Sequence, residues 1–362
     1  MSDTWEQEWL AQAGTNGRPN MIGSNTGIKL KVTTYNVAEY CMKTSTGKGT
    51  AIWSKPEKLT NLRKWIAGND TDVLLSTEDA TYLDAKETKK ATLLLYNDRL
   101  PCQQGGWVRI RSKYPITKPK KPDGSALNVV AVNPPANASK PASGTLGARY
   151  FTFGWIQIDG KSVLVVTVHP RNSAIRYKTN PKTGPVADRL NFLQIVFDLA
   201  FCLKNPKVFD GISSYTKAWD YCVIGGDFNT SNRNGEDPNG KAYKAGTQDY
   251  DNLAKIRNHY AFDSASGGYL GWLPTYPGNG DALDNVLVSD NVILNLIDNQ
   301  IGKAEILYSD HVPLVTTMTL LNKKTERFPD KTYEGKTVAK NLTELRSWLK
   351  EIMGGEINRP CK

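Results

Sequence analysis

Short apolar runs alternate with helical patterns along most of this chain. Runs that are rich in β-branched residues and bounded by polar residues or glycine predict buried strands. They span residues 28–36, 72–79, 148–159, 161–169, 220–229, 283–290 and 311–320. Apolar residues at three- and four-residue spacing predict helices over 56–67, 187–203 and 341–353. Strands interspersed with helices predict a mixed, layered α/β domain.

The remaining segments divide the chain into one main domain and two ends. Residues 1–27 form an expected N-terminal appendage, with a short helix over 3–13 and a Gly/Asn/Pro-rich link. The main domain is expected over 28–321, and 322–362 is a charged C-terminal appendage with one helix. Within the main domain, 118–147 and 231–247 are expected to be long loops.

The composition limits the class of protein. The chain has 362 residues, of which 39% are hydrophobic and 23% are charged, as in a globular protein with a substantial core. It has no apolar run of membrane-spanning length, and its polar start does not resemble a secretory signal, so we expect a cytoplasmic protein. The five cysteines form no CxxC pair, which favours free thiols over disulfides or structural zinc.

The net charge of +10 points weakly to a polyanionic partner. Basic residues outnumber acidic ones between Lys86 and Lys121 and again between Arg171 and Arg189. A basic surface raises the local concentration of nucleic acid. A solvated face explains the same charge almost as well, so charge alone favours nucleic acid only slightly.

Polar side chains stand where the predicted strands end or begin. Such residues meet at the edge of a sheet, where sites are built. They are Asn36, Glu78, His169, Asp227 with Asn229, Asp284, and Asp310 with His311. Singly, each has an ordinary explanation: Gly-Gly-Asp is common in turns, His169 suits a core, and Asp284 suits a strand start. Together they predict an active site.

The carboxylates of this set indicate a divalent cation. Two carboxylates about 4 Å apart repel by about 4 kcal/mol at an effective dielectric constant near 20. Glu78, Asp227 and Asp310 would therefore need a cation, and hard oxygen ligands favour Mg²⁺, with Mn²⁺ or Ca²⁺ as alternatives. The histidines can donate to a phosphoryl oxygen or to a leaving group.

Four ordered motifs resemble those of the endonuclease/exonuclease/phosphatase superfamily. They are YNV at 35–37, LLSTE at 74–78, GDFN at 226–229 and SDHVP at 309–313. RSKYPI at 111–116, TVH at 167–169 and the stretch 274–289 support the resemblance, which covers about residues 28–320. It implies a deoxyribonuclease I-like, four-layered α/β sandwich with two central mixed β-sheets flanked by helices, and a metal-dependent phosphodiesterase.

The resemblance also implies roles for individual residues. Glu78 is the principal metal ligand, and Asn36 and Asp310 lie beside the metal. Asp227 orients or deprotonates the attacking water with support from Asn229, and Asp284 fixes the ring of His311, which contacts the phosphate. His169 contacts the phosphate or assists the leaving oxygen. Asn172, Arg149 and Arg171 are expected substrate-binding residues.

The sequence departs from the pattern beside the metal-binding glutamate. Thr77 replaces the usual Gln, and Asp79 follows Glu78, which alters the surroundings of the ligand. The segment 171–220 is longer and more basic than usual and is placed to influence substrate choice.

Three functions remain open at this point. The first is a Mg²⁺-dependent endonuclease that hydrolyses or nicks DNA, with RNA as another polymer substrate. The second is a phosphatase or phospholipase on small phosphoesters such as inositol phosphates, or on sphingomyelin, for which the aromatic segment 267–278 and the basic segment 171–220 are the supporting features. The third is a binding protein without activity.

Overall fold

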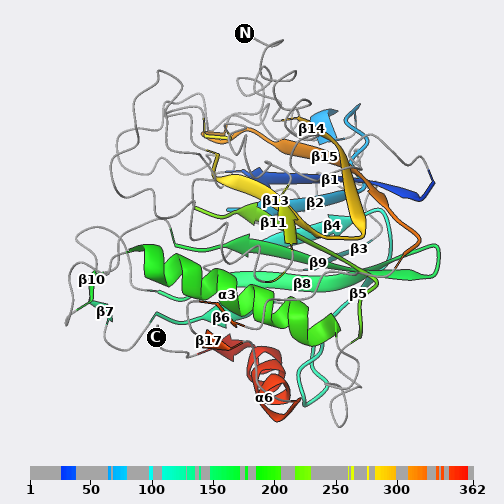
Figure 1. Cartoon of the computed structure of the whole chain (residues 1–362). Helices are drawn as coiled ribbons and strands as arrows, with labels where there is room; N and C mark the ends of the chain where they lie inside the picture. The colour runs from blue at the N-terminus through cyan, green and yellow to red at the C-terminus, as the bar shows by residue number, and fades with distance from the viewer. Residues whose placement is uncertain are drawn as a thin grey trace.

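The computed structural model describes about half of the chain. The described residues are 26–37, 64–66, 68–79, 98–100, 108–127, 129–134, 138–139, 147–171, 176–177, 185–204, 217–229, 260, 262–264, 275–276, 282–298, 309–323, 332–333, 336–337 and 342–357. They form two large β-sheets with helices outside them (Figure 1). None of the helices described is both long and apolar enough to span a membrane.

The first sheet has six strands. Only its β1–β2 pair is parallel, so the sheet is mixed. In spatial order the strands are β14 (Val292–Asp298), β15 (Leu314–Leu320), β1 (Ile28–Asn36), β2 (Val73–Thr77), β4 (Arg109–Ser112) and β3 (Asp98–Leu100).

The second sheet has eight strands and is also mixed, because its β9–β11 and β6–β18 pairs are parallel. The spatial order is β12 (Phe262–Ser264), β13 (Asp284–Ser289), β11 (Tyr221–Asp227), β9 (Lys161–His169), β8 (Arg149–Ile158), β6 (Val130–Val132) and β18 (Glu356–Ile357), with β5 (Ile116–Thr117) paired to β8. Two small pairs lie apart, β7 (Ala138–Ser139) with β10 (Arg176–Tyr177) and β16 (Thr332–Tyr333) with β17 (Lys336–Thr337).

The two sheets pack face to face around an apolar core. Alternate residues along each strand point into it, such as Leu30 and Val32 from β1 and Val163 and Val165 from β9. Burial of apolar surface stabilises a fold by roughly 25 cal/mol per Å². This layer therefore holds the two sheets, and the ends of their strands, against each other.

Helices cover the outer faces. Helices α3 (Pro185–Lys204) and α6 (Leu342–Met353) lie together against the eight-stranded sheet and share a second apolar cluster with it (Figure 1). On the six-stranded sheet, Trp65 from the helical residues 64–66 packs 6.3 Å from the ring of Tyr35, on the face of β1 opposite to Val32. Two mixed sheets with helices outside them confirm the predicted α/β sandwich.

Most predicted elements are present, with specific exceptions. All seven predicted strands are found, as are the helices predicted over 187–203 and 341–353. The long loop predicted over 118–147 is wrong in part, because β6 and β7 lie within it. Strand β14 was not predicted, nor were the short strands at Asp98–Leu100, Arg109–Ser112, Phe262–Ser264 and Glu356–Ile357, among others. The helix predicted over 3–13 and the loop predicted over 231–247 lie outside the described residues.

The C-terminal segment contributes to the main core. Leu349, Ile352 and Met353 of α6 are buried in the cluster that α3 shares with the sheet. Strand β18 extends the eight-stranded sheet through its parallel pairing with β6. The boundaries predicted at residues 28 and 321 stay predictions, but the described residues after 321 are not peripheral to the core.

Candidate active site

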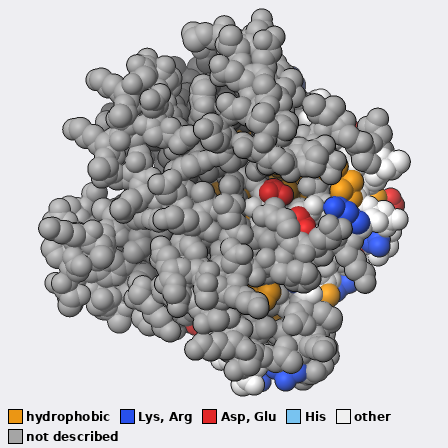
Figure 2. All heavy atoms as spheres, viewed as in Figure 1, with side chains coloured by type: hydrophobic (Ala, Val, Ile, Leu, Met, Phe, Trp, Pro, Cys, Tyr) orange, Lys and Arg blue, Asp and Glu red, His pale blue; other side chains and the backbone are white. Residues whose placement is uncertain are grey.

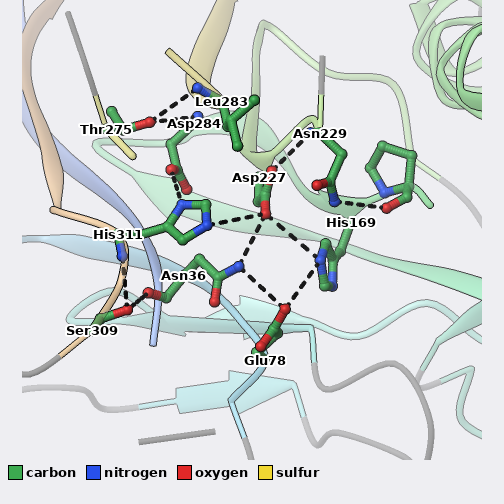
Figure 3. Close-up of polar contacts among 11 residues, drawn as sticks. Asn36, Glu78, His169, Asp227, Asn229, Thr275, Leu283, Asp284, Ser309 and His311 are labelled. Atoms are coloured by element: carbon green, nitrogen blue, oxygen red, sulfur yellow. Dashed lines mark hydrogen bonds and ion pairs between the residues drawn. The ribbon is translucent and has the colours of Figure 1, made fainter. Parts of the chain in front are cut away.

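The predicted site residues converge at one edge of the sandwich. Strands β1 and β2 are parallel, as are β9 and β11, so their carboxyl ends share an edge. Strand β13 begins at the same edge, where Asp284 pairs with Asp227 of β11. Figure 3 shows the resulting cluster. Its members are Asn36, Glu78, His169, Asp227, Asn229, Asp284 and His311.

Asn36 joins the two sheets at the centre of the cluster. Its Nδ2 donates to Asp227 Oδ2 at 2.9 Å and to Glu78 Oε1 at 3.4 Å. The backbone of Asn36 is held as well, because its carbonyl accepts a hydrogen bond from Ser309 Oγ at 2.7 Å. The same Ser309 Oγ accepts from the backbone N–H of His311 at 3.1 Å, which connects the turn carrying His311 to β1.

Two site residues lie in the left-handed backbone region. Glu78 has a φ of 49° and Asn229 a φ of 47°. This region costs a residue with a side chain roughly 1–2 kcal/mol, and such strain is concentrated at functional sites. Asn229 is anchored by its N–H to Asp227 Oδ1 at 2.7 Å and by its Nδ2 to the Pro170 carbonyl at 2.9 Å.

The Gly-Gly-Asp sequence is part of a strand, so the turn explanation for it is wrong. Residues 221–227 form β11, and a Cβ on Gly226 would lie 2.2 Å from the Val168 carbonyl oxygen of β9. A Cβ on Gly225 would lie 2.6 Å from Leu75 Cδ1 of the opposite sheet. The glycines let β11 approach both neighbours closely, which places Asp227 between the two sheets.

His311 is held in an ion pair. Its Nδ1 lies 2.7 Å from Asp284 Oδ2, and its Nε2 faces Asp227 Oδ2 at 3.8 Å. Burial opposes the charge on the ring, but the Asp284 carboxylate overcomes it and raises the pKa of His311 to about 10. The Tyr276 ring packs against the imidazole edge to face, with centroids 5.1 Å apart. At neutral pH this histidine is a cation that directs an N–H into the site.

The carboxylate that pairs with His311 is itself anchored. The hydroxyl of Thr275 accepts hydrogen bonds from the backbone N–H groups of Asp284 at 2.9 Å and Leu283 at 3.1 Å (Figure 3). The carbonyl of Thr275 accepts from the N–H of Val312 at 2.7 Å. Thr275 therefore ties the start of β13 to the turn that carries His311.

His169 has the opposite electrostatic character. Its Nε2 lies 3.6 Å from Glu78 Oε1 and 3.7 Å from Asp227 Oδ2. Burial lowers its pKa to about 4, an effect that the neighbouring Asp227 opposes. The positive charge of Arg149 lowers this pKa further. The site therefore pairs a neutral histidine with a charged one.

The carboxylates form an electrostatically unfavourable group. Burial and the charge of Asp227 raise the pKa of Glu78 to about 7, and Asp310 adds to the effect. Burial also raises the pKa of Asp227, although His311 opposes it. Among the described residues, no three His, Cys, Asp or Glu side chains are already arranged as a metal site. The donor chemistry nevertheless fits a hard cation, since the amide oxygen of Asn36 and the carboxylates of Glu78 and exposed Asp310 are its preferred ligands.

The expected substrate-binding residues are less fully placed. Asn172 lies outside the described residues. The Arg171 side chain is buried and donates to the carbonyl of Gly147, which gives it a structural contact. Arg149 is half-buried at the start of β8, next to the Tyr150–His169 pair. The roles expected for these three residues, and those expected for the central cluster, stay predictions.

Several supporting residues were not predicted from the sequence. Thr275 and Ser309 lie within motifs that were recognised in the sequence. The available signal was their position, because Thr275 directly precedes an aromatic residue and Ser309 directly precedes Asp310. The buried arginines of β4, Arg109 and Arg111, were also missed. Two arginines alternating within an apolar strand indicate a buried anionic partner, which the structure identifies as Asp79.

Similar proteins were found among the solved structures alone. No protein-family model matches this chain, and no curated protein matches it. A solved endonuclease/exonuclease/phosphatase from Bacteroides vulgatus is similar, with 13% identity, a TM-score of 0.52, and 81% of this chain and 99% of that chain covered. A family protein from Bacteroides thetaiotaomicron has 12% identity, a TM-score of 0.49, and coverage of 82% and 99%. One from Beutenbergia cavernae has 14% identity, a TM-score of 0.47, and coverage of 81% and 72%. The likeness to the Bacteroides vulgatus structure shows that this chain has the endonuclease/exonuclease/phosphatase fold.

Proposed function

We propose that this protein is a divalent-metal-dependent phosphodiesterase and that DNA is its substrate. The observation that carries the proposal is a cluster at one edge of the sandwich, where an amide, two carboxylates, one charged histidine and one neutral histidine converge (Figure 3). Hydrolysis of a phosphodiester needs a general base, donors for the phosphoryl oxygens and compensation of negative charge. This group of residues contains a base and two donors, and its carboxylates would hold a cation that compensates the negative charge.

Each side chain has a task that its environment suits. Asp227 is buried and has a raised pKa, so it can accept a proton from an attacking water. Asn36 and Asn229 hold both of its oxygens in place. Charged His311 donates from Nε2 to a phosphoryl oxygen, and Asp284 keeps its ring charged and oriented. Neutral His169 donates one N–H to the phosphate or to the leaving oxygen.

The carboxylates define where a cation would be held. Glu78, Asn36 and Asp310 would bind it, with Mg²⁺ favoured and Mn²⁺ or Ca²⁺ as alternatives. When bound, such a cation offsets the charge of the carboxylates and of the phosphodiester. The raised pKa of Glu78 supports this assignment, because the carboxylate is ionised at low cost only beside a positive charge.

The choice of DNA rests on charge. The chain carries 46 Lys and Arg against 36 Asp and Glu, so it attracts polyanions in general. RNA and small phosphoesters such as inositol phosphates present the same scissile group. They are therefore the comparison substrates of the test.

The test is cleavage of supercoiled plasmid by the full chain. Conversion to nicked and linear forms is expected with Mg²⁺ and is expected to stop with EDTA and with Glu78→Gln. Asp72→Asn is the matched control. Asp72 lies directly before β2, at the opposite end of this strand from Glu78, and pairs with Lys113. This variant is expected to cleave normally.

Two results would contradict parts of the proposal. Hydrolysis of an inositol phosphate but not of plasmid, by folded protein, would exclude DNA and retain the phosphoesterase. Absence of hydrolysis of plasmid, RNA and small phosphoesters with Mg²⁺, Mn²⁺ and Ca²⁺ would leave only a binding protein.

A further inference from the structure

The residue after Glu78 is buried in an ionic cluster on the opposite face of the sheet from the site. Asp79 has no exposed surface. Its Oδ2 accepts hydrogen bonds from Arg111 Nη1 and from Ser76 Oγ, and its Oδ1 lies 3.8 Å from Arg109 Nε. The carbonyl of Asp79 also accepts from Arg109 Nε at 3.4 Å. Both the side chain and the backbone of this residue are therefore held.

The strand register separates Asp79 from the site. Leu75 of β2 points into the core between the sheets, so Ser76 points to the outer face. Ser76 lies opposite Arg109 in the β2–β4 pair, which puts that arginine on the outer face as well. Asp79 returns to this outer face, whereas Glu78 reaches the edge between the sheets. Simple alternation from Ser76 would place Glu78 on the outer face and Asp79 on the inner face, so the order of side-chain directions is reversed at Glu78.

The left-handed backbone of Glu78 accomplishes this reversal. A φ of 49° is a conformation that residues with a side chain rarely adopt, so it persists only where the surroundings enforce it. Val37 N–H donates to the Thr77 carbonyl at 3.0 Å and anchors the backbone before Glu78. The arginines anchor the backbone after it. Glu78 is thus fixed from both sides, although its own carboxylate is 34% exposed.

We propose that Asp79, held by Arg111, Arg109 and Ser76, is the positioning residue that directs Glu78 into the cation-binding site. The inference rests on the proposed function, because it assigns Glu78 to the cation. Asp79 touches neither the cation nor the substrate and acts only through the conformation of Glu78. A paired, buried carboxylate is suited to this task, since burial opposes its charge but Arg111 keeps its pKa below the usual range.

The test is Mn²⁺ binding to the full chain, measured by electron paramagnetic resonance after removal of metal. Asp79→Asn keeps the shape of the side chain and removes its charge, and it is expected to weaken Mn²⁺ binding by about 10- to 100-fold. Cleavage at saturating Mn²⁺ is expected to fall much less than the affinity. Asp72→Asn is the matched control, because Asp72 also pairs with a cation, Lys113, but at the other end of β2. It is expected to leave the affinity unchanged.

A second variant and a second readout keep the test decisive. If Asp79→Asn does not fold, Ser76→Ala removes a single hydrogen bond from the same carboxylate and is expected to weaken binding in the same direction. A crystal structure of either variant is expected to show Glu78 outside the left-handed region. Unchanged Mn²⁺ affinity with φ of Glu78 still near its present value would overturn the positioning role. A wild-type chain without Mn²⁺ affinity would contradict the proposed function, and φ of Glu78 in the variant would then decide the positioning role alone.

Discussion

Burial disfavours the charge on both histidines of the site, but their partners differ. His311 shares a 2.7 Å contact with Asp284 and is charged, whereas His169 has no carboxylate closer than 3.6 Å among the described residues and is neutral. A desolvated imidazole loses its proton unless a nearby anion offsets the loss of water. The difference in charge between the two histidines therefore depends on Asp284.

Removing the charge of Asp284 is expected to lower the pKa of His311. In Asp284→Asn this pKa falls from its present value of about 10, because only the more distant carboxylates of Asp227 and Asp310 then oppose the effect of burial. Hydrolysis is expected to fall by about 10²- to 10⁴-fold, as for loss of a general acid or an oriented imidazole. An NMR titration of the His311 ring between pH 5 and pH 9 measures the change. An unchanged titration in the variant would refute this account of the dyad.

Glu78 is expected to lower the stability of the metal-free protein at high pH. Its pKa is about 7 in the fold against an ordinary value of 4.5, so the folded state holds its proton more tightly. Its contribution to stability is fully present below about pH 4.5 and is lost as the pH rises through 7.

The variant that tests this is Glu78→Gln in EDTA. At pH 8 it is expected to be more stable than the wild type by about 1–2 kcal/mol, a figure reduced to allow for the partly exposed carboxylate. Urea unfolding at pH 8 and at pH 4.5 measures the difference, which should disappear at the lower pH. Equal stabilities at pH 8 would show that Glu78 carries no electrostatic strain.

At the scale of elements, the site depends on how closely β11 approaches its neighbours. Gly226 has a φ of 140° and its α-carbon faces the backbone of β9. Gly160, in the turn between β8 and β9, also has a positive φ of 75° but has nothing within 4 Å of a built Cβ. Substitution of each glycine by alanine can therefore distinguish the energetic cost of a positive φ, present at both positions, from the cost of a steric clash, present only at Gly226.

Alanine at these two positions is expected to have unequal effects. Gly160→Ala pays only the backbone cost, about 1 kcal/mol. Gly226→Ala adds a clash with the Val168 carbonyl oxygen, so it is expected to cost about 3 kcal/mol or more and to displace Asp227. Urea unfolding of both variants, with Mn²⁺ affinity, measures the two effects. Equal destabilisation would mean that β11 can move away from β9 freely.

At the scale of the whole molecule, the positive charge is distributed beyond the site. The Lys and Arg side chains visible in the space-filling view lie at its right and bottom (Figure 2). Lys161 begins β9, at the opposite end of that strand from His169, and Lys217 Nζ contacts Gln157 at 2.9 Å near the same end. These lysines attract polyanions without lying beside the catalytic cluster.

Salt is expected to weaken the binding of DNA, because binding involves many phosphate contacts. Lys161 and Lys217 are not expected to make any of these contacts. Affinity for a duplex oligonucleotide, measured by fluorescence anisotropy, is expected to fall at least about tenfold between about 50 mM and about 200 mM salt. Lys217→Gln is expected to leave the slope of log K against log salt unchanged. A change of slope by about one in this variant would place DNA at the far end of the sandwich instead.

The class of fold and the residues of the central cluster could be predicted from the sequence. Apolar, β-branched runs bounded by polar residues or glycine predicted seven strands, and the polar ends of these runs predicted Asn36, Glu78, His169, Asp227 and His311 together, because run length and flanking residues are local properties of the chain. Strand β14 and the short strand β6 were missed, since neighbours across the sheet stabilise them.

The protonation of the site and the contacts that support it depend on tertiary structure. The pKa of His311 and His169 depends on burial and on carboxylates from other strands, which no local pattern encodes. The Gly-Gly sequence before Asp227 was compatible with a turn until the proximity of Val168 and Leu75 explained it. The pairing of Asp79 with Arg111 joins residues 32 positions apart, so it exists only once β2 and β4 are side by side.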